Sequence, residues 1–171
     1  LAALVHERGF LELSQEEPRV ARALVRVRLD DESRGLRGEI GLSERGWYQA
    51  RTGVCEVRLL YRGRYVGATR FRLPLGHGEA VVACDRFRMR ADWKEVEHDE
   101  AYFEVVHRVE RSVEALYLEV LEKMQREHGT VNQLVAWFEW MCCMVESSRE
   151  HGVFGEAFVG RVQSASVWKV W

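Results

Sequence analysis

The sequence predicts an α+β fold, in which an antiparallel sheet of about five to six strands packs against a long helical hairpin. Apolar and polar residues alternate over residues 20–90, as in half-buried strands, whereas apolar residues recur at spacings of three and four over residues 99–150, as in amphipathic helices. The chain has 171 residues, of which 47% are hydrophobic, and this is enough to build one hydrophobic core. We therefore expect a single domain over residues 1–171, with a basic β-rich half at 19–90 and an acidic helical half at 91–171.

Five stretches of the first half have the composition and alternation of strands. In the first of them, Val25 and Val27 fall on one face, while Arg26 and Arg28 fall on the other. The third and fourth stretches flank Tyr61-Arg62-Gly63-Arg64, which has the residues of a tight hairpin turn. The expected strands are residues 23–29, 36–42, 54–61, 64–73 and 79–90, with a C-terminal strand at 167–171.

The second half begins with one long helix, expected over residues 99–128. Its apolar stripe runs from Phe103 to Met124, at the spacing of a helix face that packs on a core. On the other face, Glu104 and Arg108 are four residues apart, which we interpret as a solvent-exposed ion pair. Such a pair stabilises a helix by only about 0.2–0.5 kcal/mol, so it marks the solvated side.

A second helix is expected over residues 131–150. Gly129 is a natural end for the first helix, and Thr130 with Gln133 forms a capping box for the next one. Apolar side chains occupy nearly every face of this second helix, so it must be buried on several sides or contact a second subunit. We therefore expect a homodimer.

The formal net charge of −2 conceals an uneven distribution of charge along the chain. Residues 19–90 contain 16 arginines, no lysine and eight acidic residues, whereas residues 91–171 contain eight basic and 15 acidic residues. This asymmetry indicates either an anionic partner for the basic half or pairing between the two halves. The longest apolar run, Trp140 to Val145, has six residues, far fewer than the about 20 of a membrane-spanning helix, so we expect no membrane partner.

Sequence motifs of the common enzyme classes are absent. The chain has no nucleophile elbow, no phosphate-binding loop, no zinc-binding HExxH helix and no dinucleotide-binding glycine fingerprint after a strand. Its four cysteines have no regular spacing, which argues against a metal knuckle and favours a reducing compartment, cytoplasmic or nuclear. We therefore expect a non-enzymatic protein with no catalytic residue, no cofactor and no metal site.

The alternating arginines make the most specific prediction. Seven of them share one parity within three expected strands, so adjoining strands would place them on one face of the sheet. Guanidinium groups bind phosphate in bidentate fashion, and aromatic side chains near turns can stack on bases. We therefore expect a nucleic-acid-binding protein that recognises RNA or duplex shape. The predicted binding residues are Arg26, Arg28, Arg70, Arg72, Arg86, Arg88, Arg90, Trp47 and Tyr48.

A second interpretation is a protein–protein interaction module. The same arginines would then pair inside the fold with acidic side chains from residues 95–127, since long arginine side chains often cover a sheet in this way. Tryptophans would anchor the partner, because this residue is frequent at binding hot spots. The candidate anchors are Trp137, Trp140, Trp168 and Trp171. The two interpretations differ in whether the sheet arginines are exposed or paired.

Two short elements resemble the ligand-binding motifs of PilZ domains. Arg22-Ala23-Leu24-Val25-Arg26 matches the RxxxR element of that family, and residues 41–46 (Gly-Leu-Ser-Glu-Arg-Gly) resemble its (D/N)xSxxG element, with Gly41 at the Asp/Asn position. PilZ domains are barrels that bind cyclic di-GMP through these two elements. The resemblance implies a third interpretation, a sensor of a cyclic dinucleotide or another small anion, in which replacing Arg22 or Ser43 by alanine abolishes nucleotide binding.

Overall fold

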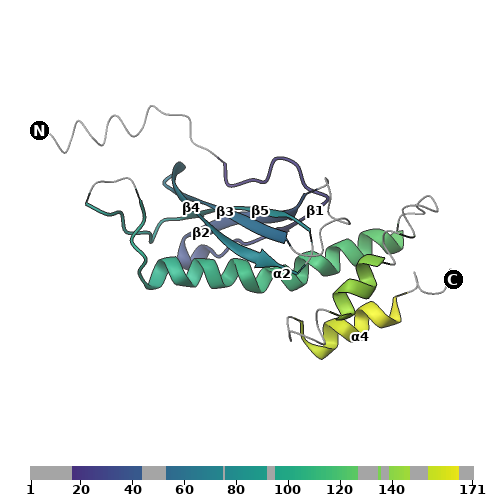
Figure 1. Ribbon diagram of the computed structural model, residues 1–171. Coiled ribbons are helices and arrows are strands. Elements are labelled where there is room, and N and C mark those ends of the chain that lie inside the picture. Colours follow the sequence, from purple (N-terminus) through teal and green to yellow (C-terminus); the bar gives the residue numbers. More distant parts are fainter. Residues whose placement is uncertain are drawn as a thin grey trace, which may run out of the picture.

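The computed structural model describes residues 17–43, 53–74, 76–91, 95–126, 135, 139–146 and 154–165. The described residues form a fold of the predicted α+β class, in which one long helix packs across one face of a five-stranded sheet (Figure 1). The strands are β1 (Val25–Arg28), β2 (Leu36–Leu42), β3 (Gly53–Tyr61), β4 (Arg64–Leu73) and β5 (Gly78–Cys84). The helices in the described ranges are the 3₁₀ turn η1 (Glu32–Arg34), α2 (Glu100–Arg126), α4 (Glu156–Ser164) and residues 139–146.

The sheet is mixed, and the prediction of an antiparallel sheet is wrong at one pair. The strand order is β1-β2-β5-β3-β4, and β5 runs parallel to β3 while the other neighbouring pairs are antiparallel. The β3–β4 hairpin is as predicted, since Arg62 and Gly63 have φ angles of 50° and 76°, both in the left-handed region that a type I′ turn requires. After this hairpin the chain crosses the start of β3 and inserts β5 between β2 and β3, which makes the β3–β5 pair parallel.

Two glycines make this crossing possible. Gly76 lies in the connection from β4 to β5 with a φ of 71°, a left-handed conformation that residues with side chains rarely adopt. Gly53, the first residue of β3, lies against it, and a Cβ atom on Gly53 would overlap the carbonyl group of Gly76. The two backbones therefore pass each other at a separation that only a residue without a side chain allows.

The fifth strand is shorter than predicted. β5 ends at Cys84, although the alternation of apolar and charged residues continues beyond it. Residues 88–90 instead pair with residues 95–97, through backbone hydrogen bonds of 2.7 and 2.9 Å around a β-bridge between Met89 and Val96. The period-two alternation therefore reflects a small local pairing that lies outside the main sheet.

Helix α2 begins and ends within two residues of its predicted bounds. The carboxylate of Asp99 accepts a hydrogen bond from the Tyr102 N–H (3.1 Å) and so caps the start of the helix. Of the second predicted helix, residues 135 and 139–146 are helical, and its other residues lie outside the described residues, as does the strand predicted at 167–171. Within the described ranges, no helix is both long enough and apolar enough to cross a membrane.

Helix α4 is not expected from the sequence. Gly160 lies inside it, and glycine disfavours a helix by about 1 kcal/mol relative to alanine. Phe158 and Val162 are nevertheless fully buried, and the Phe158 ring stacks on Phe154 at a centroid distance of 4.4 Å. Tertiary packing of these apolar side chains therefore stabilises a helix that local propensity does not favour.

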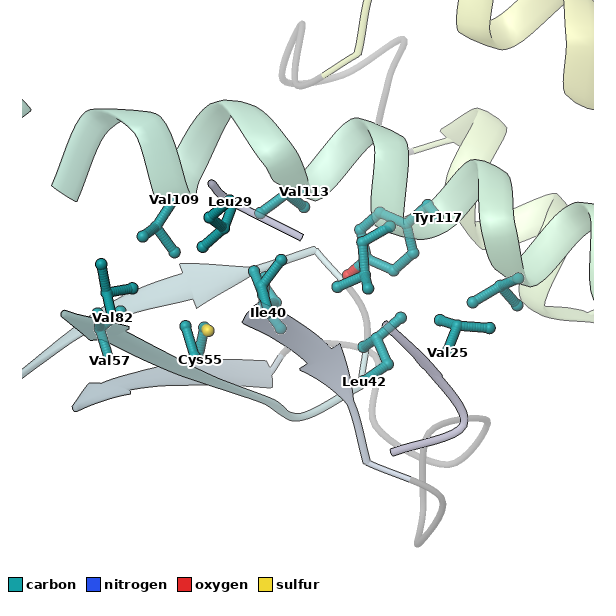
Figure 2. Close-up of a cluster of buried hydrophobic side chains, with 14 of the residues drawn as sticks. Val25, Leu29, Ile40, Leu42, Cys55, Val57, Val82, Val109, Val113 and Tyr117 are labelled. Atoms are coloured by element: carbon teal, nitrogen blue, oxygen red, sulfur yellow. The ribbon is translucent and has the colours of Figure 1, made fainter. Parts of the chain in front are cut away.

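The main core lies between the sheet and α2. Figure 2 shows aliphatic side chains of the sheet, such as Ile40, pointing toward Val113 and other residues of α2. The fully buried Tyr117 lies at the centre of a second set of contacts, with ring centroids 5.6 Å from Trp140 and 5.4 Å from Phe154. Helix α2 therefore packs on the sheet with one side and on residues 139–146 and α4 with another (Figure 1).

The opposite face of the sheet, called the far face below, is covered among the described residues by the segment before β1. Val20 of this segment packs against Leu60, Val81 and Ala83, which form a small apolar patch. The N–H of Val20 also donates a hydrogen bond to the Glu39 carboxylate (3.3 Å). Beyond this patch, most exposed side chains of the far face are charged, and Val54 is an exposed apolar one.

Replacing Gly53 by alanine is expected to lower the free energy of unfolding by about 3 kcal/mol or more, because the new Cβ atom would displace the connection that inserts β5. Gly160→Ala is the matched control, since nothing lies within 4 Å of a Cβ atom there and the helix gains about 1 kcal/mol of propensity. Urea unfolding followed by circular dichroism measures both variants. A Gly53→Ala variant as stable as the wild type would contradict the crossing.

Candidate functional site

The strands place arginines mainly along the two edges of the far face. Because β1 and β4 are the edge strands of a five-stranded sheet, their arginines are separated by four strand spacings, about 19 Å. Glutamates occupy each of the three strands between them, so no continuous basic surface spans the face. The far-face arginines are Arg26, Arg28, Arg37, Arg58, Arg70 and Arg72, and the glutamates are Glu39, Glu56 and Glu79.

Two of these arginines neutralise the centre of the far face. Glu56 and Glu79 are register partners in the parallel β3–β5 pair, and like charges directly opposite each other destabilise a sheet. The Arg70 guanidinium contacts the Glu56 carboxylate at 2.7 Å, and that of Arg58 contacts the Glu79 carboxylate at 3.6 Å. Arg58 and Arg70 therefore relieve a repulsion that the strand order creates.

The three arginines after β5 do not belong to the far face. Each one contacts a carboxylate from residues 95–104. The pairs are Arg86 with Glu104 (3.0 Å), Arg88 with Asp99 (3.8 Å) and Arg90 with Glu95 (2.7 Å). The seven predicted arginines therefore do not share one surface, because β5 ends at Cys84 and the strand order separates the other four. Trp47 and Tyr48 lie outside the described residues.

Arg86 belongs to a cluster of charges that joins α2 to the sheet. Arg108 of α2 donates to the Asp31 carboxylate at 2.9 Å, in the turn between β1 and β2. Glu104, one turn earlier on α2, contacts both Arg34 and Arg86. Glu104 and Arg108 therefore bind partners on other elements, and the ion pair predicted between them along the helix is wrong.

Asp31 makes this cluster sensitive to acid. Its pKa lies below the usual value of 3.8, chiefly because the Ser33 hydroxyl donates a hydrogen bond to it (2.6 Å), and also because Arg108 and Arg34 are close. A carboxylate whose folded-state pKa is lowered stabilises the fold above its unfolded pKa and loses this contribution as the pH falls through the folded pKa.

Asp31→Asn is therefore expected to lower the free energy of unfolding at neutral pH, and the difference from the wild type should shrink as the pH falls below 3.8. Urea titrations of both proteins at neutral pH and at a series of acidic pH values measure this difference. If it stays constant across the series, the Asp31 carboxylate does not stabilise the fold through its charge.

The first element that resembles a PilZ motif and residues 41–43 of the second lie close together at the β1 edge of the sheet. Arg26 of β1 is the register partner of Gly41 in β2, and Ser43 directly follows β2. Arg22 precedes β1 by three residues and, like Arg26, is exposed. The Arg26 guanidinium donates to the Ala21 carbonyl oxygen (3.3 Å), which holds the segment before β1 against the strand. Arg22, Arg26 and Ser43 therefore lie at one corner of the sheet.

A groove opens beside this corner, between β1 and the last two turns of α2. Its volume of about 400 Å³ is within the range of small-ligand sites. The groove is lined by Leu24, Val25, Arg26, Glu119, Lys123 and Arg126. Three of these six residues are basic and one is acidic, so the groove favours an anion. We call Arg22, Arg26, Ser43, Lys123 and Arg126 together the β1-edge site.

Sequence reasoning did not identify Lys123 and Arg126 as binding residues. Basic residues in the last turn of a helix are ordinary partners of its dipole, so their type and position carry no functional signal by themselves. What distinguishes them is that the end of α2 lies beside β1, and the sequence does not reveal this contact.

A second groove of about 540 Å³ lies between the end of β4 and the middle of α2. Arg72 and Arg111 line it together with Glu110 and Glu114, so its two arginines are offset by two glutamates. His107 also lines this groove, with its Nδ1 atom 3.1 Å from the Glu110 carboxylate. This balance of charge gives the second groove no clear preference for an anion.

Cys55 and Cys84 are buried in the core, which suits them to packing and not to nucleophilic chemistry. Burial raises the pKa of the Cys55 thiol to about 12, and burial also raises the pKa values of Cys84 and Cys142. All four cysteines are free thiols. Within the described residues, no group of three or more His, Cys, Asp or Glu side chains is arranged to hold a metal ion.

Trp140, one of the predicted partner anchors, belongs to the core of this chain. It is 3% exposed and packs with Tyr117, and Met141 and Met144 of the same helix are buried in the same core. The other three tryptophans lie outside the described residues, and the homodimer and the tryptophan-anchored partner stay predictions.

In comparisons with known proteins, no family model, curated protein or solved structure matches this chain significantly.

Proposed function

We propose that the protein is a non-enzymatic sensor that binds a small phosphate-bearing ligand, in particular a cyclic dinucleotide, at the β1-edge site. The observation that carries this proposal is the β1–β2 pairing, which brings the Arg22–Arg26 element close to Ser43 at the β1 edge of the sheet. Among the described residues, no carboxylate lies within 4 Å of either arginine, and guanidinium groups bind phosphate in bidentate fashion. The four free thiols favour a reducing compartment, cytoplasmic or nuclear, for this sensor.

The β1-edge site differs from the PilZ pattern at Gly41. A Cβ atom at this position would lie 2.6 Å from the Cβ atom of Ala23, because the segment before β1 crosses β2 there. An acidic or amide side chain at position 41 is therefore incompatible with this packing. We expect recognition to depend on the phosphates of the ligand, through Arg22 and Arg26.

Titration calorimetry with cyclic di-GMP tests this function. We expect saturable binding that Arg22→Ala or Ser43→Ala weakens by about tenfold or more, since a hydrogen bond to a charged group contributes about 1.5–3 kcal/mol. Arg62→Ala is the control, because it removes an exposed positive charge at the distant β3–β4 turn. Absence of saturable binding, or an equal loss of affinity in the control, would refute a specific site at the β1 edge.

Nucleic-acid binding on the far face is the second candidate function. Arg28, Arg37 and Arg72 are exposed, and they make no hydrogen bond or ion pair with any described residue. Arg28 and Arg37 lie on the adjacent strands β1 and β2, where they can contact neighbouring phosphates. The exposed pair of Arg70 with Glu56 is worth only about 0–1 kcal/mol, so a phosphate can displace it. Such contacts favour RNA or duplex shape over base sequence.

An Arg28→Ala/Arg37→Ala variant is expected to bind a short duplex RNA more weakly than the wild type. The slope of log K against log salt concentration should fall by about 0.9 for each phosphate contact that is lost. Arg88→Ala/Arg90→Ala is the matched control, since both of these arginines are engaged outside the far face. Fluorescence anisotropy with duplex RNA, single-stranded RNA and duplex DNA, at low and moderate salt, measures the effect. Binding that is insensitive to salt would exclude phosphate contacts on this face.

A further inference from the structure

We propose that α2 supplies the second half of the β1-edge site, so that the ligand must carry two separate phosphates. This rests on the function proposed above. One phosphate binds Arg22 and Arg26 on the strand side, and the other binds Lys123 and Arg126 on the helix side. The preferred ligand is then a cyclic dinucleotide or another compact molecule with two phosphates, and a mononucleotide is a poor ligand.

The groove between β1 and α2 brings Arg26 of the strand side next to the helix side, and Arg22 and Ser43 are not among its lining residues. Arg26 lines it from the strand, and Lys123 and Arg126 line it from the last two turns of the helix. Leu24 and Val25 provide the apolar part of the wall, against which a sugar or base ring can pack. Four of the six lining residues are charged, which suits a polar, anionic ligand, and the volume of about 400 Å³ is within the range of small-ligand sites.

Arg126 is not neutralised by the acidic residue four positions before it. In an isolated helix, Glu122 and Arg126 would form an ion pair across one turn. The Glu122 carboxylate instead contacts the Arg161 guanidinium of α4 at 3.2 Å. Arg126 uses its Nε–H to bind the backbone carbonyl of Glu122 (3.2 Å), which orders the side chain and leaves both terminal nitrogens without a described carboxylate. These two nitrogens are in position to donate to an anion in the groove.

The helix dipole does not account for the whole charge of the groove. Lys123 and Arg126 complement the negative end of α2, as basic residues in a last turn commonly do. Arg26 comes from a strand, where no such dipole exists, and it lines the same groove. Among the residues that line the groove, only Glu119 carries a carboxylate, so the cations of both elements attract the phosphates of a ligand that lies in it.

The affinities for two probes test the requirement for two phosphates. The probes are cyclic di-GMP, which carries two phosphates, and GMP, which carries one. We expect the wild type to bind cyclic di-GMP about tenfold or more tightly than GMP. Lys123→Gln/Arg126→Gln, which preserves helix propensity, should lose about tenfold in affinity for cyclic di-GMP and little for GMP. Arg111→Gln is the matched control for the single variant Arg126→Gln, because it likewise removes one positive charge from α2, outside this groove.

The other outcomes separate the two proposals. If the wild type binds neither probe, both the proposed function and the two-phosphate requirement are wrong. If the double variant binds cyclic di-GMP as tightly as the wild type does, the function stands and α2 does not contact the ligand. If the double variant loses affinity for both probes equally, a single phosphate binds all four basic residues and the two-phosphate requirement is wrong. Circular dichroism verifies folding of each variant, and Arg126→Gln alone replaces the double variant if that one unfolds.

Discussion

Where the chain passes from β4 to β5, its backbone lies against Gly53, and the positions of all five strands depend on this contact. In a simple meander, β5 would have followed β4 at the edge of the sheet, and the arginines of both strands would have formed the continuous basic face that their alternation predicts. The passage of Gly76 over Gly53 instead directs β5 to the middle of the sheet. β1 and β4 become the two edges, and their arginines are separated by glutamates on the strands between them.

The position of α2 follows from burial and from charge together. A helix of 27 residues is about 40 Å long, whereas β4, the longest strand with 10 residues, spans about 33 Å. The stripe that includes Val109 and Val113 supplies most of the stabilisation, since exposed ion pairs contribute only about 0–1 kcal/mol each. The contacts of Glu104 and Arg108 determine where the first half of α2 lies on the sheet. The second half then passes β1, where it forms the groove and packs against residues 139–146 and α4.

The local sequence pattern predicted most of the strands and the long helix, because these elements depend mainly on interactions between residues close in sequence. Alternation predicts β2 and β4 to the residue, and the apolar stripe predicts α2 within two residues. The strand order was not predictable in this way, because the parallel β3–β5 pair joins distant segments and depends on a contact between two glycines. Glu104 and Arg108 also show that local spacing does not predict tertiary contacts. They are four residues apart, which predicts an ion pair along the helix, but each of them contacts a residue on another element. Of the candidate site, short motifs identified Arg22 and Ser43, and they gave no information about the helix that lies beside them.

The positive charge of the β1 edge has one explanation that needs no ligand. Edge strands commonly carry charged residues that prevent pairing with other chains, and this accounts for Arg26 and Arg28 on a strand of four residues. It does not account for Lys123 and Arg126, because these residues lie on a helix and have no strand edge to protect. They converge with Arg26 because the end of α2 lies beside β1, and no described carboxylate contacts Arg126, because the Glu122 carboxylate contacts Arg161. A phosphate-binding site requires cations from two elements to converge on one groove. Protection of a strand edge does not require this.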